Sequence, residues 1–185
     1  MSTARTTAPA GGPAMSYIAG SSTDVAIREF RRRWVPMLTT IAAILLSLLP
    51  IVATSPLIPD LGFIMLLTWR LLRPEIWKPY HALGLGLLSD LVSGNPIGQA
   101  MLIWTAIFLA LEIIDARLGF RDYLMDWLIA AAAIILQSVG AWYIALLMGS
   151  GIRFAVLWPQ VALGVIAYPV AARLVLALDR WRLAR

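Results

Sequence analysis

Few residues in this chain are suited to chemistry, and the most conspicuous is Asp90, an aspartate within an apolar stretch. The chain has no cysteine and a single histidine, His81, which excludes thiol catalysis and a metal site built from several Cys or His ligands. The sequence also contains no nucleophile elbow, no zinc-protease pair and no phosphate-binding loop. We therefore expect no catalytic residues, no metal and no cofactor.

Asp90 lies in the stretch LLSDLVSGNPIGQ, which is apolar on both sides of a break at Ser93–Pro96. A carboxylate in a bilayer costs several kcal/mol unless it is paired, hydrated or neutralised. Three roles are open for it. Asp90 accepts hydrogen bonds from N–H groups of the turn and from Ser93, or it forms an ion pair with Arg153, or it exchanges protons in a transport path.

The break itself predicts a short helix–turn–helix link. Gly94 suits the left-handed position at a helix C-terminus, because it has no Cβ to clash there. Asn95 suits the N-cap of the next helix, and Pro96 suits its first position, where no N–H is needed. Gly98 and Ala100 are small enough to let two helices approach closely.

The composition places these residues in a membrane protein. Of the 185 residues, 61% are hydrophobic and 14% are charged, whereas soluble domains have about 45–50% apolar and about 25% charged residues. The net charge of +5 does not indicate nucleic acid, because the basic residues flank apolar segments. We expect an all-α integral membrane protein.

Six apolar segments predict a compact bundle of six transmembrane helices, since a span needs about 20 apolar residues. An arginine, Arg70, closes the second span and is long enough to reach the lipid headgroups. Few polar groups are available to line a cavity. The predicted spans are Trp34–Thr54, Leu57–Leu72, Pro79–Ser93, Pro96–Ile114, Trp127–Met148 and Phe154–Leu176.

The remaining segments predict the domain boundaries and the topology. Residues 1–27 are expected to form a disordered tail and residues 28–185 the membrane domain, with Asp24 as a candidate N-cap of a helix that leads into the first span. The basic cluster Arg31–Arg33 suits anionic headgroups or acts as a plain stop. Of the fifteen Lys and Arg residues, all but Arg153 fall on one side of the predicted membrane, which predicts cytoplasmic termini.

Two motifs resemble those of the MreD family of bacterial rod shape-determining membrane proteins. The stretch Asp90–Gly98 is similar to the family signature Asp-Leu-x-Ser-Gly-x-x-x-Gly. Thr68-Trp69, followed by Leu71, Leu72 and Pro74, resembles the family's aromatic-Trp and proline pattern, with Thr68 where an aromatic residue is expected. The resemblance extends over about residues 30–185.

The resemblance implies a non-catalytic scaffold in the bacterial inner membrane. It implies that the chain binds an MreC-like membrane protein and works with a RodA-type glycosyltransferase, its partner transpeptidase and MreB filaments in peptidoglycan synthesis and rod shape. It also implies a fold similar to the substrate-binding subunits of energy-coupling-factor transporters. The alternative function is a small-molecule binding subunit of a transporter. The motif residues with a structural or partner-binding role are Asp90, Leu91, Ser93, Gly94, Asn95, Pro96 and Gly98, with Asp90 and Arg153 as a candidate ion pair.

Overall fold

A computed structural model describes residues 22–49, 58–117, 122–149 and 154–183, and all the regular secondary structure in these ranges is helical. Three helices, α5, α6 and α7, are each long and apolar enough to cross a bilayer, and two shorter apolar helices cover Trp34–Leu46 and Leu61–Leu72. The elements are α1 (Ser22–Leu46), α3 (Leu61–Leu72), α4 (Pro79–Ser93), α5 (Gln99–Arg117), α6 (Tyr123–Leu147), the 3-10 helix η1 (Phe154–Val156) and α7 (Leu157–Leu183).

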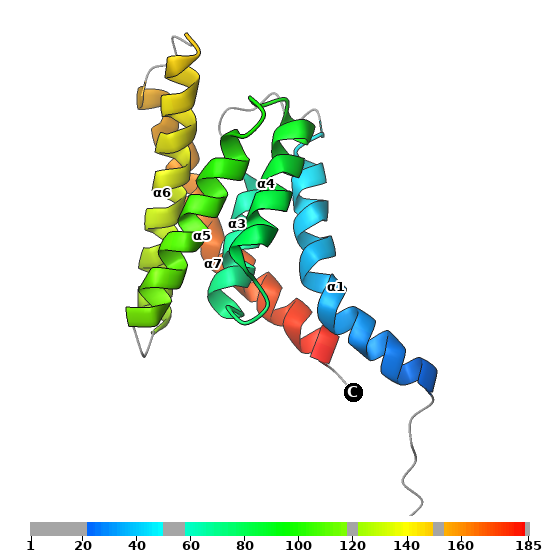
Figure 1. Cartoon of the computed structure of the whole chain (residues 1–185). Coiled ribbons are helices and arrows are strands. Elements are labelled where there is room, and N and C mark those ends of the chain that lie inside the picture. Colours follow the sequence, from blue (N-terminus) through cyan, green and yellow to red (C-terminus); the bar gives the residue numbers. More distant parts are fainter. Residues whose placement is uncertain (1–21, 50–57, 118–121, 150–153, 184–185) are drawn as a thin grey trace, which may run out of the picture.

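Helix α3 is the centre of the bundle. It packs against α1, α6 and α7, while α4 packs on α5 and α5 on α6 (Figure 1). Nine of its twelve residues are buried, and all of its residues except Thr68 and Arg70 are apolar or glycine, as expected for a helix surrounded by others. The bundle has two ends. The α4–α5 link lies at one, which we call the link end, and α1 begins and α7 ends at the other, which we call the terminal end (Figure 1).

The core is built from large aromatic side chains that the apolar segments contribute. Trp69, Trp104 and Phe63 are buried, and the rings of Phe63 and Trp104 lie 5.6 Å apart. Trp69 also donates a hydrogen bond from its indole N–H to the Thr39 hydroxyl of α1, at 3.0 Å. Trp69 of the second sequence motif is therefore a core residue that ties α3 to α1.

The helix bounds correct two of the expected boundaries. Helix α1 begins at Ser22, so Asp24 lies inside its first turn and the prediction that Asp24 is the N-cap is wrong. Helix α5 begins at Gln99, three residues after the predicted start at Pro96. The second half of the first predicted span and the start of the second extend into residues 50–57, which lie outside the described residues. The predicted boundary between a tail and the membrane domain at residue 27 stays a prediction, since residues 1–21 lie outside the described residues.

Candidate functional site

The Asp90 carboxylate caps the N-terminus of the helix that follows its own. Oδ1 accepts a hydrogen bond from the Ala100 N–H at 2.8 Å. Oδ2 accepts hydrogen bonds from the Gly98 N–H at 3.0 Å and the Met101 N–H at 3.3 Å. The side chain is buried, with 1% of the residue exposed. A helix N-terminus carries partial positive charge and unpaired N–H groups, so the carboxylate is well placed there.

This arrangement answers why an apolar stretch contains Asp90. Asp90 stands near the C-terminus of α4, where the helix dipole disfavours a carboxylate, but its oxygens lie at the N-terminus of α5, where the dipole favours one. Of the roles proposed for Asp90, these hydrogen bonds match that of an acceptor for N–H groups of the turn. The predicted share of Ser93 in it is not seen, because Ser93 lies exposed at the end of α4.

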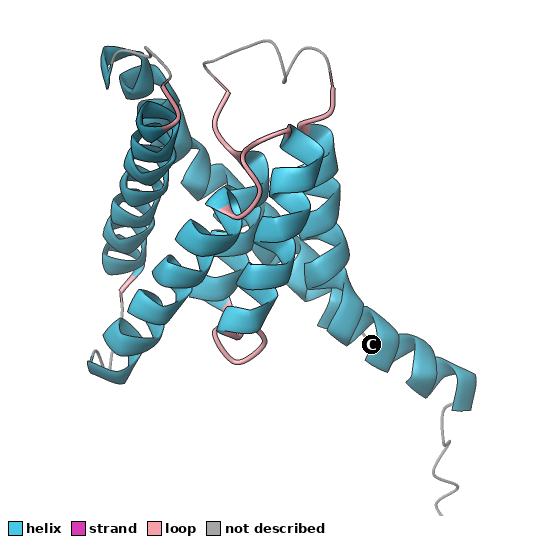
Figure 2. Cartoon of the chain, turned by 45° about the horizontal axis from the view of Figure 1, so that its top comes forward, coloured by secondary structure: helices cyan, strands magenta, loops and turns pink. Residues whose placement is uncertain are grey.

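The link between α4 and α5 (Gly94–Gly98) depends on two glycines (Figure 2). Gly94 ends α4 in the left-handed conformation with φ +67°, as predicted. Gly98, with φ +99°, immediately precedes α5, and its carbonyl accepts the Leu102 N–H. Gly98 therefore holds the N-cap position but has no side chain to cap with, and Asp90 supplies the missing acceptor.

The prediction that Asn95 caps the next helix and Pro96 starts it is wrong. Residues Pro96 and Gln99 close a turn before the helix, in which the Gln99 N–H donates to the Pro96 carbonyl at 3.0 Å. Asn95 is exposed. A carboxylate from α4 already satisfies the N–H groups of α5, so the local Asn-Pro pair is not needed as a cap.

Gly86 brings the two helices close enough for Asp90 to reach α5. Gly86 lies one turn before Asp90, and a Cβ at this position would stand 2.6 Å from the Met101 Cα and 2.7 Å from its N. No side chain larger than hydrogen fits against the α5 backbone there. Gly98 does not share this role, since a Cβ there meets nothing within 4 Å, and neither does Gly84. The expectation of close packing at Gly98 is thus wrong, whereas Ala100 is buried at 3% exposure.

The rest of the motif faces outward. Leu91 is 62% exposed and Ile97 76% exposed, so the motif has a buried half around Asp90 and an outer half formed by these side chains. The candidate partner of Asp90 in an ion pair, Arg153, lies outside the described residues, and that pairing stays a prediction.

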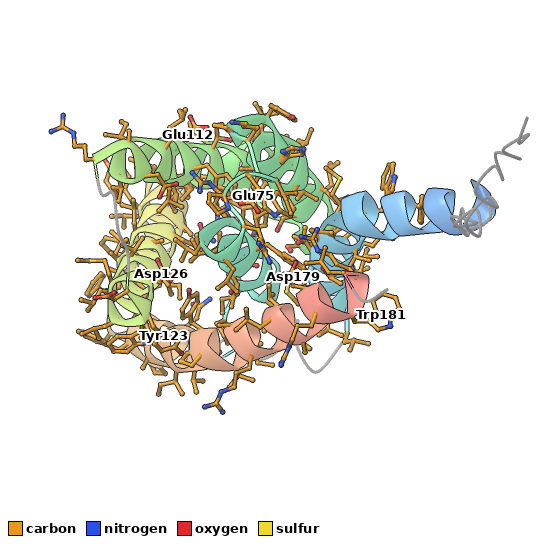
Figure 3. The ribbon with its side chains drawn as sticks, turned by 90° about the horizontal axis from the view of Figure 1, so that it is seen from below. Glu75, Glu112, Tyr123, Asp126, Asp179 and Trp181 are labelled. Atoms are coloured by element: carbon orange, nitrogen blue, oxygen red, sulfur yellow. The ribbon has the colours of Figure 1, made fainter. Side chains whose placement is uncertain are left out.

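The terminal end holds a second polar cluster, which ties the C-terminus of α3 to α7. The Arg73 guanidinium donates to Asp179 Oδ2, with its Nε at 3.1 Å, and Arg182 donates to Oδ1 at 2.6 Å. The hydrogen bond to Asp179 raises the pKa of Arg73, although partial burial opposes this. Figure 3 shows Asp179 on the inner side of α7 and Trp181 on its outer side. The sequence did not reveal this cluster, because Arg73 and Asp179 are 106 residues apart.

Arg70 belongs to the same end but not to the surface. It is 2% exposed, and its Nη1 lies 2.7 Å from Asp115 Oδ2 on α5. Its guanidinium also lies over the Phe108 ring, 5.9 Å from the centroid. The prediction that Arg70 reaches the lipid headgroups is wrong, because a carboxylate on the neighbouring helix pairs with it inside the protein.

A cavity of about 520 Å³ lies at the link end, beside the α4–α5 link. Asp60 lies in its wall, where it caps α3 by accepting the Phe63 N–H at 3.0 Å and accepts Gln137 Nε2 at 3.2 Å. The Gln137 carbonyl oxygen is buried there with no hydrogen-bond partner among the described residues. The expectation of few polar lining groups is therefore wrong. The polar lining residues are Asp60, Asn95, Gln99, Gln137, Ser138 and Gln160.

These groups position helices rather than reacting groups. Within the described residues no cluster of three or more His, Cys, Asp or Glu side chains could hold a metal ion. The Asp90 carboxylate accepts hydrogen bonds from three backbone N–H groups and is buried. What the arrangement can do is hold α4 and α5 at a fixed distance and fix the path of the chain between them.

Comparison with known proteins gives a match to a family model described as rod shape-determining protein MreD, over residues 28–178. No curated protein matches the chain, and no solved structure matches it. The expected likeness to the substrate-binding subunits of energy-coupling-factor transporters therefore stays a prediction. The matched range contains the described bundle from the first half of α1 to near the end of α7.

Proposed function

Because the chain belongs to the MreD family of rod shape-determining proteins, we propose that it is a scaffold of the bacterial cell-elongation complex in the inner membrane. Members of this family are non-catalytic membrane proteins of the rod complex. The observation that carries the proposal is the family match over residues 28–178, which is most of the chain. In this role the protein binds an MreC-like membrane protein and supports peptidoglycan synthesis and rod shape.

The proposed topology has six spans and cytoplasmic termini. Three spans correspond to the long apolar helices α5, α6 and α7. The loop between α3 and α4 carries Arg73 and Lys78 at the terminal end, and Arg117 ends α5 there. This charge distribution supports a cytoplasmic terminal end by the positive-inside rule. The link end then faces the outer side, toward the cell wall.

The proposed mechanism is mechanical support rather than chemistry. The Asp90 hydrogen bonds and the close contact at Gly86 fix α4 against α5, and the Arg73–Asp179 pair fixes α7 against the α3–α4 loop. A rigid bundle of this kind offers a constant surface to a partner helix at little entropic cost. The exposed Leu91 and Ile97 of the motif are the candidates for contact with the MreC-like protein at the link end. RodA-type synthase, its transpeptidase and MreB filaments are then held directly or through that partner.

Depletion of the protein in its own host tests the proposal. Cells that lose it are expected to become round and to lose lateral wall incorporation of a fluorescent D-amino acid, and a plasmid copy should restore both. The matched variants are Asp90→Ala, expected to fail, and Ser93→Ala, expected to complement because Ser93 is exposed. Normal rod shape and wall growth after depletion would contradict the proposal.

The cavity beside Asp60 favours one alternative, a small-molecule binding subunit of a transporter. Its volume of about 520 Å³ lies within the usual range of about 300–1,000 Å³ for ligand pockets. The unpaired Gln137 carbonyl oxygen and the Asp60 carboxylate are both acceptors, which fits a ligand with N–H or O–H donors. Native mass spectrometry of the protein in nanodiscs distinguishes the two functions. A bound small molecule lost in Gln137→Leu, together with an ATPase partner, would support transport over scaffolding.

A further inference from the structure

The first half of α1 extends away from the helix bundle (Figure 1). Figure 1 shows α1 changing direction partway along its length, so that its first turns run away from the bundle at the terminal end. Pro36 lies inside α1, and a proline there cannot donate to the preceding turn and favours a kink. The Thr39 and Thr40 hydroxyls both donate to the Pro36 carbonyl, at 3.0 and 2.8 Å, a pattern that bends helices.

The sequence of α1 changes from charged to apolar close to Pro36. Trp34–Leu46 is the apolar part of α1, and Ser22–Arg33 is the charged part. The charged part contains four arginines against two acids, Asp24 and Glu29, so its formal charge is positive. By the period of an α-helix, positions 26, 30 and 34 share one face and positions 28, 31 and 32 the opposite one. The first face carries Ala26, Phe30 and Trp34, with Arg33 at its edge because it follows Ala26 by seven positions. The second face carries Arg28, Arg31 and Arg32.

An aromatic pair stands on the apolar face. The rings of Phe30 and Trp34 stack at 5.9 Å, and these residues are 57% and 44% exposed. Paired aromatic side chains that protein does not cover are typical of the headgroup region of a bilayer. The pair thus leads directly from the apolar part of α1 into the charged part.

We propose that Ser22–Arg33 lies along the cytoplasmic membrane surface and binds anionic lipid headgroups. The Phe30–Trp34 face enters the headgroup region, and the arginine face meets the negative surface of the leaflet. The positive charge of the segment complements the negative charge of the headgroups. The apolar part of α1, Trp34–Leu46, places the segment next to a membrane. The inference rests on the chain's place in a membrane with cytoplasmic termini and not on its role in wall synthesis.

Spin labelling of the full-length protein in nanodiscs tests the proposal. The chain has no cysteine, so Ala26→Cys and Asp24→Cys each give a single labelling site, and both leave the four arginines in place. In nanodiscs with anionic lipid, the label at position 26 should be more accessible to oxygen than to a nickel chelate. The label at position 24 should show the opposite preference. In purely zwitterionic nanodiscs the difference between the two positions should fall at least threefold.

Matched charge variants test which arginines are responsible. Arg31→Gln/Arg32→Gln should lose the response to anionic lipid, whereas Arg117→Gln/Arg180→Gln, exposed residues at the same end, should keep it. Unchanged melting temperatures show that the variants fold. Equal nickel access at positions 24 and 26 in anionic nanodiscs would overturn the proposal, as would a depth that ignores lipid charge. Protection of position 26 only after addition of cytoplasmic protein would assign the segment to a protein partner instead.

Discussion

Replacement of Asp90 should open the first turn of α5 selectively. Its carboxylate accepts the N–H groups of Gly98, Ala100 and Met101 at 3.0, 2.8 and 3.3 Å, and it is buried. A hydrogen bond to a charged group contributes about 1.5–3 kcal/mol net. The two shorter bonds therefore set an upper range of about 3–6 kcal/mol, whereas N-cap replacements cost about 0.5–2 kcal/mol. We expect a cost of about 3 kcal/mol for Asp90→Ala, at the lower end of the hydrogen-bond range and just above the N-cap range.

Asp90→Asn should cost about half as much, because the amide keeps one acceptor and turns an NH2 group toward the remaining backbone N–H groups. Amide hydrogen exchange of the protein in nanodiscs measures the effect. A local cost of about 3 kcal/mol corresponds to exchange about a hundredfold faster at the amides that Asp90 binds. Amides in the middle of α6 should be unaffected.

The control for this experiment is Ser93→Ala, because Ser93 is exposed and lies in the same motif. It should change stability by no more than about 0.5 kcal/mol, as is usual at exposed positions. Equal exchange rates at Gly98, Ala100 and Met101 in Asp90→Ala and Ser93→Ala would refute the capping role.

Melting temperatures of the purified protein in detergent check three further expectations. Gly86→Val should destabilise by at least about 1–3 kcal/mol through overpacking against α5, whereas Gly84→Val, where a Cβ meets nothing within 4 Å, should be nearly neutral; equal effects would contradict the contact. Asp179→Asn should lower the melting temperature. Replacement of Arg73 should then have little further effect in this variant, whereas additive losses in the double-mutant cycle would argue against the pair. Arg70→Met should cost about 2 kcal/mol, because it removes the ion pair with Asp115, whose carboxylate is partly exposed; no loss would show that the pair is not needed.

The all-helical architecture could be predicted from the sequence because long apolar segments and their flanking charges are local signals. Helix α4 has the predicted bounds, Pro79–Ser93, since a proline starts it and a left-handed glycine ends it. The helix that leads into the first span was also predicted, with Asp24 as its N-cap, and it begins two residues earlier, at Ser22.

The contacts of the candidate site were harder to predict, because they join residues that only the fold brings together. Local capping rules favoured Asn95, yet the acceptor for α5 comes from Asp90 in the helix before it. Arg70 looked like a snorkelling residue because no rule of sequence spacing connects it with Asp115. The lining of the cavity likewise combines Asp60 and Gln137 from different helices. The sequence identified each of these side chains as a polar residue in an apolar segment, but it did not identify the partner of any of them.

The central claim is that this chain is a scaffold of the rod complex, and its direct test is what the protein binds in its own membrane. We would purify it from native membranes in a mild detergent at its natural abundance and identify the bound proteins by mass spectrometry. The account predicts recovery of an MreC-like protein together with the elongation synthases, with less recovery from an Asp90→Ala strain. Recovery of an ATPase module and a coupling membrane subunit, without an MreC-like protein, would contradict it.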